Sequence, residues 1–266
     1  MIQTPLLDDE DGFTLCCLNC RSWTNWRRNG LGNRRAYKLA CTIFFLMYAG
    51  WYFSMVMGSP VLVICGGIFV VKIQIETWGQ ETPTWVVPSS PMLFIVVYGL
   101  GIPSIVYLFG GCRNQDIDFR FREALGLVSY LFGSCYSLGY ELHRFWWKSK
   151  PENKGKLHTT GLASFCIHPN YLGDIFTYGG WALASGTLCA LSIVPAQIGY
   201  LQLFICPNSD AYLASRYSSE FPAYAATTAT LIPGLRSTGI VMKILAWICL
   251  GFSFWMQAKC SSACGL

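Results

Sequence analysis

Charged side chains are scarce in this chain. Only 12% of its 266 residues are Asp, Glu, Lys or Arg, and 53% are hydrophobic, whereas soluble domains carry about 25% charged residues. So little charge excludes an ordinary soluble surface and indicates a membrane protein. Because a spanning helix needs about 20 mostly apolar residues, the apolar runs predict an all-α, polytopic membrane bundle of six or seven transmembrane helices.

The chain also lacks the sequence features of a signal peptide and of a cysteine-based metal site. The first 38 residues contain no apolar run that could serve as a signal-peptide core, so we expect no cleavage. The 13 cysteines are scattered, mostly within apolar runs, where free cysteine packs as a small apolar side chain. Cys17 and Cys20 form a lone CxxC without a second ligand pair, so we expect no metal site. With Cys16 they could instead be palmitoylated.

Seven apolar runs are candidate spans, some strong and some marginal. Gly58, Ser59 and Pro60 separate the first two runs, and so tight a junction predicts a helical hairpin. The runs cover residues 39–57, 61–71, 92–109, 124–140, 175–188, 190–205 and 240–256.

The runs divide the chain into four regions. We expect a polar head over 1–38, N-terminal spans over 39–123, a catalytic region over 124–236, and a last span with a tail over 237–266. Basic residues gather in the head and again between Arg144 and His158. Because cytosolic segments carry an excess of Lys and Arg, we expect a cytosolic N-terminus, and the endoplasmic reticulum is the expected membrane.

Polar residues are concentrated in "SFCIHPNYLGDIFTYGGW", residues 164–181, at the start of an apolar run. Pro169 suits the first position of a helix, which places His168 at the cap. A helix N-terminus attracts anions such as phosphate. Asn170 and Tyr171 follow in the first turn. Asp174 would lie just inside the membrane border, and because a carboxylate is costly there, it indicates a functional site by default. The alternative is that these residues only cap the helix.

The same helix has a polar face and several glycines. Asp174 lies four residues before Tyr178, so both side chains project from one face. Gly173, Gly179 and Gly180 carry no side chain that would keep another backbone or a ligand away.

Two polar segments flank this helix in the sequence. The upstream segment, "YELHRFWWKSKPENKGKLHTTG", covers residues 140–161, and the downstream segment, "NSDAYLASRYSSEFPAYAATTATLIPG", covers residues 208–234. We expect both to close over the mouth of the helix, supplying cations for phosphates, aromatic faces for a base or nicotinamide, and groups for proton transfer. The result would be a cytosolic-face cofactor pocket above an apolar slot for a lipid.

These motifs resemble a known family. "PENKGKL", "GLASFCIHPNYLGD" and "RYSSEFPAYAATTATLIPG", in this order, are similar to the C-terminal domain of the steroid 5-alpha-reductase and DUF1295 group, within a wider set of membrane reductases and isoprenylcysteine methyltransferases. The resemblance covers about Tyr140 to Gly234. It implies an enzyme that uses NADPH to reduce an activated carbon–carbon double bond in a steroid, sterol or related lipid, with no nucleic-acid partner.

The resemblance also implies roles for single residues. Tyr178 and Tyr140 are the candidate proton donors, and Glu141 is a further catalytic candidate. The implied cofactor-binding residues are His143, Arg144, His168, Asn170, Tyr171, Asp174, Asp210, Arg216 and Tyr217.

The chain departs from the family pattern at Ile167, where relatives usually carry arginine. Arg144 or a loop lysine would have to replace that cation, or activity is altered or lost. In the N-terminal half, "KIQIETWGQET" offers Gln74 and Glu76 near a span end, and we expect an ordinary solvated loop there.

Two other functions stay open. A methyltransferase that uses S-adenosylmethionine shares the histidine-proline-tyrosine motif, but its relatives typically carry paired glutamates where this chain has Asn208, Ser209 and Asp210. The substitution at Ile167 also leaves room for a non-catalytic sterol-binding relative.

Overall fold

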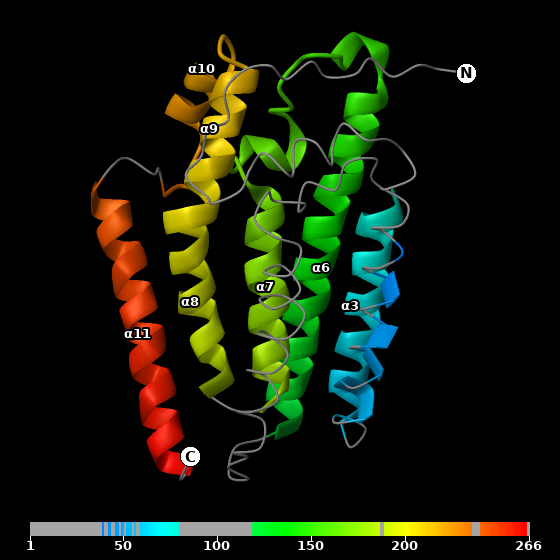
Figure 1. Ribbon diagram of the computed structural model, residues 1–266, viewed down its shortest axis with the longest axis vertical. Coiled ribbons are helices and arrows are strands. Elements are labelled where there is room, and N and C mark those ends of the chain that lie inside the picture. The colour runs from blue at the N-terminus through cyan, green and yellow to red at the C-terminus, as the bar shows by residue number, and fades with distance from the viewer. Residues whose placement is uncertain are drawn as a thin grey trace.

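The computed structural model describes residues 60–79, 119–186, 189–235 and 240–264, together with scattered positions between 39 and 59 (Figure 1). Within these ranges there is no β-strand, which confirms the all-α expectation for this part of the chain. The expected span over 92–109 lies outside the described residues. The longer helices are α3 (Pro60–Gly79), α6 (Phe119–Ser149), α7 (Pro169–Ala184), α8 (Ile193–Tyr200), α9 (Cys206–Arg216) and α11 (Ile240–Cys264).

The long helices lie side by side, and from α6 onward they alternate in direction (Figure 1). α7 begins at the end of the bundle where α6 finishes, α8 and α9 return to that end, and α11 then leads away from it (Figure 1). The short helices η2 (Pro151–Asn153), η3 (Gly161–Ser164) and α10 (Phe221–Thr227) lie at the same end. We call this end the mouth, and define it as residues 140–171 and 206–230.

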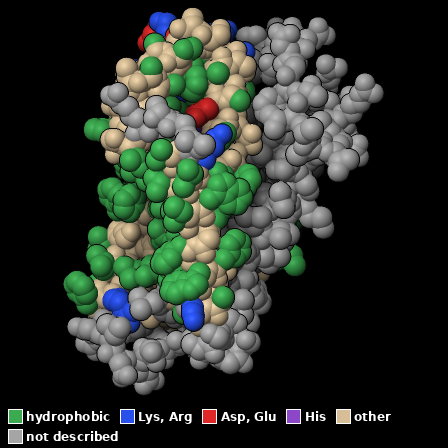
Figure 2. All heavy atoms as spheres, turned by 90° about the vertical axis from the view of Figure 1, so that its left-hand side faces the viewer, with side chains coloured by type: hydrophobic (Ala, Val, Ile, Leu, Met, Phe, Trp, Pro, Cys, Tyr) green, Lys and Arg blue, Asp and Glu red, His purple; other side chains and the backbone are tan. Residues whose placement is uncertain are grey.

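Two helical stretches are long and apolar enough to cross a membrane, Cys189–Arg216 and Val241–Lys259, and Pro60–Ile75 is a shorter apolar helix. On the α11 side, hydrophobic side chains cover the middle of the surface and Lys and Arg lie toward its ends (Figure 2). Exposed side chains on α11 include Trp247, Ile248 and Phe254. These features support membrane association. The number of spans, six or seven, stays a prediction.

α6 and α7 pack so closely that only glycine fits at their contact. A Cβ atom added to Gly133 would lie 2.3 Å from the backbone nitrogen of Thr177, and one added to Gly173 would lie 2.7 Å from that of Ser137. Gly126 and Gly180 repeat this arrangement seven residues away on each helix. Small residues allow this close backbone approach between membrane helices. At Gly173 and Gly180 the neighbour is therefore a backbone, which decides between the two alternatives that the sequence left open.

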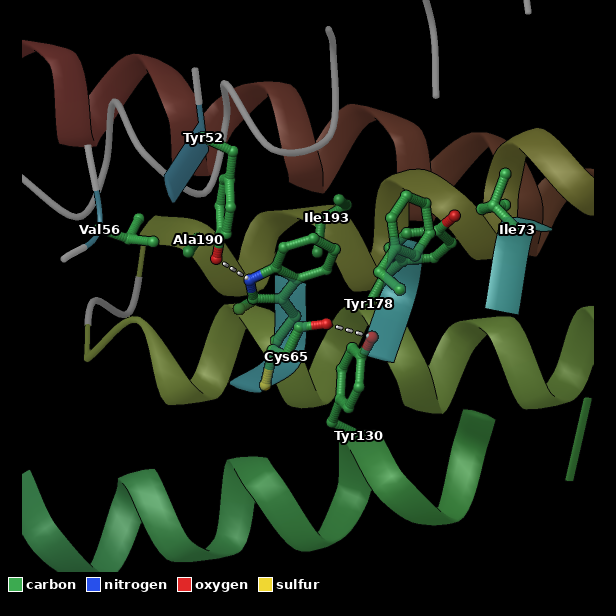
Figure 3. Close-up of a cluster of buried hydrophobic side chains, with 11 residues drawn as sticks. Tyr52, Val56, Cys65, Ile73, Tyr130, Tyr178, Ala190 and Ile193 are labelled. Carbon is green, nitrogen blue, oxygen red and sulfur yellow. Dashed lines mark hydrogen bonds between the residues drawn. The ribbon is translucent and has the colours of Figure 1, made fainter. Parts of the chain in front are cut away.

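An aromatic cluster lies between α3, α6 and α7. The Trp181 indole N–H donates to the Tyr52 hydroxyl at 3.0 Å, and the Tyr130 hydroxyl donates to the carbonyl of Cys65 at 2.6 Å (Figure 3). Each polar tip of these buried rings thus has a partner, as buried Tyr and Trp require. The cluster fixes α3 against the two helices that carry the polar motifs.

Two local features differ from what the sequence predicts. α3 continues to Gly79, so the expectation of a solvated loop after Val71 is wrong: Ile73 is buried, and Gln74 accepts a hydrogen bond from Thr42 at 2.9 Å. Between α8 and α9, residues Leu201–Ile205 form a π-helical turn, η5, closed by the N–H of Cys206 on the carbonyl of Leu201. η5 joins α8 and α9 into one continuous helix.

Candidate active site at the mouth

The start of α7 is held from outside the helix. His168 is the N-cap and Pro169 the first helical residue, as the sequence predicts. The N–H groups of Ile167 and His168 donate to the carbonyls of Ala229 and Thr230, at 2.8 and 3.1 Å. This strand-like pairing ties the beginning of α7 to the end of the downstream segment.

Side chains of α7 and α9 form the centre of the mouth. His168 Nε2 lies 2.9 Å from a carboxylate oxygen of Asp210, and the hydroxyls of Tyr171 and Ser209 are 3.1 Å apart. The rings of His168 and Tyr171 stack with their centroids 5.1 Å apart. The downstream segment therefore does close over the helix start, as expected, and it brings two predicted cofactor residues into contact.

The last turns of α6 supply a second polar group. The Arg144 guanidinium donates to Glu141 at 2.6 Å, and the Lys148 ammonium donates to the Tyr217 hydroxyl at 2.8 Å while lying 4.6 Å from the centre of that ring. Lys148 also donates to the carbonyl of Lys156. Arg144 and Tyr217 are thus fixed by neighbours within the mouth.

Two pockets open beside this centre. A pocket of about 500 Å³ lies between α6 and η3, and it is lined by Tyr140, His143, Gly161, Leu162, Ser164 and Phe165. A smaller one of about 110 Å³ lies between α9 and α11, where Asp210, Thr230 and Lys243 are among the lining residues. Three residues that the sequence singles out, Tyr140, His143 and Asp210, therefore line pockets.

Asp174 lies deeper along α7, and its carboxylate is hydrogen-bonded to other residues of the chain. Its carboxylate accepts hydrogen bonds from the Lys72 ammonium at 2.8 Å and from the Ser137 hydroxyl at 3.0 Å, and Lys72 also donates to Ser137 at 3.2 Å. Lys72 is only 6% exposed. Lys72 is not predicted from the sequence, because a charge directly after an apolar run indicates the end of a span. The signal that could have found it is a lone cation in an apolar context, which needs a buried acid as partner.

The remaining predicted residues separate into two groups. Tyr178 is buried in the aromatic cluster (Figure 3), 6.1 Å from Phe69 between ring centres. Tyr140 instead lines the larger pocket. At the mouth, Asn170 is half-buried in the first turn of α7 and Arg216 is exposed at the end of α9. The two candidate proton donors are thus in different environments.

Residues 206–230 cover the start of α7, and we call them the cap. Ile167 belongs to a small apolar cluster beneath this cap. It packs with Leu157 and Phe221, and the partly buried Tyr217 and Tyr224 lie against them. Burial raises the pKa of the Tyr224 phenol, whose hydroxyl donates to the carbonyl of Ala163 at 2.5 Å. An arginine at position 167 would either bury its charge in this apolar cluster or direct its side chain away from the cluster. The isoleucine therefore has a packing role that attaches the cap to the start of α7.

Comparisons with known proteins give a family. The family model described as "Protein of unknown function (DUF1295)" matches residues 72–228, more than half of the chain. The chain is also 33% identical over 96 residues to a protein of Ustilaginoidea virens named "Probable O-methyltransferase ustE", a match that covers 36% of this chain and 34% of that protein. The chain thus spans about a third of the length of this relative. No solved structure matches it. The matched family region includes Lys72, the motif around His168 and most of the downstream segment, and the chain belongs to the DUF1295 family.

Proposed function

We propose that the protein is an integral membrane oxidoreductase that uses NADPH to reduce an activated carbon–carbon double bond in a steroid, sterol or related lipid. The observation that carries this proposal is the combination at the mouth of His168, Asp210 and Tyr171 with the adjoining pocket lined by Tyr140. This polar centre stands at the end of an apolar helical bundle. A water-soluble cofactor and a membrane-dissolved substrate can meet there.

The charges at the mouth suit a phosphorylated cofactor. Lys150, Lys154 and Arg216 are exposed there, and cations of this kind pair with phosphate oxygens. Of the four acids of the mouth, Glu152 is exposed and the other three have partners within the protein. They are Glu141, paired with Arg144, Asp210, paired with His168, and Glu220, which accepts from the N–H of Leu157. NADPH carries phosphates and S-adenosylmethionine carries none, so this balance favours the dinucleotide.

Tyr140 is the better supported of the two candidate proton donors. When bound, NADPH would supply a hydride to the electron-poor carbon of the double bond. A proton must then reach the other carbon or an enolate oxygen, and Tyr140 lines the pocket where a substrate would bring these atoms. Tyr178 is buried in the hydrophobic cluster between α3, α6 and α7. We therefore assign Tyr140 as the proton donor. Glu141 would position Arg144 beside it through their ion pair.

A second candidate is a methyltransferase that uses S-adenosylmethionine. The relative named "Probable O-methyltransferase ustE" favours it. Against it stands the downstream segment, which has Asn208, Ser209 and Asp210 in place of the paired glutamates expected for that activity. The third alternative is a non-catalytic sterol-binding protein. Ile167 is compatible with it, because this residue replaces the expected cation with an apolar side chain that packs at the mouth.

Cofactor titration separates these alternatives. The purified full chain in detergent is titrated with NADPH and, separately, with S-adenosylmethionine while the melting temperature is measured. Binding of NADPH alone supports the reductase, binding of S-adenosylmethionine alone contradicts it, and binding of neither favours the sterol-binding protein. Asn170→Ala should weaken NADPH binding about tenfold or more. Ala226→Ser, an exposed and uncharged change on α10 at the same end of the bundle, is the matched control and should leave binding unchanged.

A further inference from the structure

The smaller of the two pockets lies between α9 and the first turn of α11, apart from the pocket lined by Tyr140. Its volume is about 110 Å³, and the polar Gln202, Asp210 and Lys243 are among the residues that line it. Pockets that take a whole small molecule measure about 300–1,000 Å³, whereas a cavity for one water needs about 10–15 Å³. This pocket therefore has room for a head group of several atoms and not for a dinucleotide.

The pocket contains an acid and a base that do not pair with each other. Asp210 contacts His168 through one carboxylate oxygen, Oδ1, at 2.9 Å, and its Oδ2 has no hydrogen-bond partner among the residues that the structure describes. Lys243 is exposed and has no ion pair or hydrogen bond within that same part of the chain. Acidic and basic side chains lie close together in the upper part of this face (Figure 2). The pocket thus offers a free carboxylate oxygen and a free ammonium at two separate points.

Lys243 lies at the level of the membrane surface. It is the third residue of the candidate span Val241–Lys259. From Lys243 to Lys259 the helix rises about 24 Å, at about 1.5 Å per residue, which approaches the thickness of the hydrocarbon core, about 30 Å. Trp247 follows on the same face of α11 and is 60% exposed, as is typical of tryptophan at the membrane–water interface. The phosphates of membrane lipids lie at this depth.

The surface beneath the pocket suits acyl chains. Ile244 and Ile248 of α11 and Phe204 of η5 are exposed apolar side chains. α11 also packs firmly on α8, since a Cβ atom added to Gly199 would lie 2.6 Å from the carbonyl oxygen of Ala246. The two helices therefore hold the pocket in place above an apolar surface.

We propose that this pocket binds the head group of phosphatidylethanolamine from the leaflet on the mouth side. The phosphate lies beside Lys243, and the ammonium lies beside Oδ2 of Asp210. The acyl chains then follow the exposed apolar surface of α11 and η5. This lipid is neither the substrate nor the cofactor of the proposed function, and its binding does not depend on that function.

The two charges of the pocket set a preference among phospholipids. A primary ammonium has three N–H donors, and such a donor forms a strong hydrogen bond with a carboxylate. The trimethylammonium of phosphatidylcholine has no N–H and is larger. Phosphatidylglycerol has no cation, so its phosphate charge would lie near Asp210 without compensation. If Lys243 were only a surface lysine that reaches toward any lipid phosphate, the three lipids would bind equally.

Native mass spectrometry of the full chain, released from detergent micelles, tests this site. The protein is mixed with phosphatidylethanolamine, phosphatidylcholine or phosphatidylglycerol of identical acyl chains, without cofactor. We expect at least fivefold more bound phosphatidylethanolamine than either other lipid, and equal binding of the ethanolamine and choline lipids would overturn the proposal. Soluble phosphoethanolamine in tenfold excess should displace little of the lipid, because it lacks acyl chains. Complete displacement would contradict a lipid as the ligand.

Two variants change the pocket in independent ways. Lys243→Met removes the cation, and Met242→Trp fills the pocket from a half-buried position, so failure of one to fold leaves the other. Either should lower the binding of phosphatidylethanolamine about tenfold. Lys259→Met, the same substitution at an exposed position near the other end of α11, is the matched control and should not. Undiminished binding in both pocket variants refutes the site.

Asp210→Asn tests the ammonium end alone. It removes the charge but keeps an oxygen for the contact with His168. The preference for phosphatidylethanolamine over phosphatidylcholine should fall from at least fivefold to less than about twofold, and a preserved preference contradicts the role of Asp210. Because no cofactor is present, failure of NADPH to bind in the separate titration would refute the reductase and leave this site standing, whereas loss of lipid selectivity would do the reverse.

Discussion

The ion pair between Lys72 and Asp174 gives the sharpest prediction about stability. Asp174→Asn keeps the size of the side chain but removes the carboxylate charge beside the Lys72 ammonium, which is 6% exposed and still donates to the Ser137 hydroxyl. Removing one partner of a buried pair costs about 3–5 kcal/mol. Because Ser137 remains, we expect a loss near the lower end, about 3 kcal/mol.

The opposite change should cost less. Lys72→Met leaves Asp174, whose side chain is 25% exposed and still accepts the Ser137 hydroxyl. We expect a loss of about 1–2 kcal/mol, in the range for a hydrogen bond to a charged group. The double variant Lys72→Met/Asp174→Asn removes both charges of this pair, so it should be more stable than the sum of the two single losses implies, by at least about 1 kcal/mol.

Equilibrium unfolding in mixed detergent micelles, followed by circular dichroism, measures these free energies. Lys154→Met, which removes an exposed lysine at the mouth, is the control and should change stability by less than about 0.5 kcal/mol. Strict additivity of the two single changes, or a larger loss for Lys72→Met than for Asp174→Asn, would refute the reasoning. If Asp174 also contacts cofactor, Asp174→Asn should weaken NADPH affinity beyond its effect on stability, whereas equal losses make the residue structural.

Three further predictions concern other parts of the bundle. Gly133→Ala should destabilise the protein by about 3 kcal/mol, the upper part of the range for overpacking, because its Cβ would lie 2.3 Å from backbone; Gly139→Ala, with no atom within 4 Å, should not destabilise it in the same unfolding assay. Since burial lowers the pKa of His158 to about 4 when folded, from about 6.5 when unfolded, stability should fall by up to about 3 kcal/mol as the pH drops through this window, and unfolding of His158→Phe should show a smaller slope there. Tyr224→Phe removes the hydrogen bond to Ala163 and should cost about 1 kcal/mol, measured as faster proteolysis of residues 206–230; unchanged cleavage would argue against a role in holding the cap.

The sequence could predict features that depend on neighbours along the chain. Proline at position 169 fixed the helix start, and the helix cap at His168 follows from it. The polarity of the downstream segment was sufficient to expect closure over this point, and the contact of His168 with Asp210 confirms it. The glycine spacing predicted a close approach, although only the structure shows that the partner is the α6 backbone.

Features that depend on distant parts of the chain could not be predicted in the same way. Lys72 and Asp174 are 102 residues apart, so without the fold each was interpreted alone: the lysine as the end of a span, the acid as a cofactor contact. Ile167 was seen only as a missing cation, because the apolar neighbours Leu157 and Phe221 come from other segments. Burial of Tyr178 likewise depends on α3, whose packing no local pattern of α7 encodes.

The π-helical turn η5 implies a constraint on chain length. It holds one residue more than a regular α-helical turn, and Ser209 and Asp210 follow it on α9. Each residue of an α-helix turns the chain by about 100°, so deleting one residue between Leu201 and Ile205 would rotate Ser209 and Asp210 away from Tyr171 and His168. Substitutions at the exposed Phe204 change no such angle. Among natural variants of this protein, residues 201–205 should therefore differ in identity much more readily than in number, and insertions or deletions there should be rare even where the surrounding sequence has diverged.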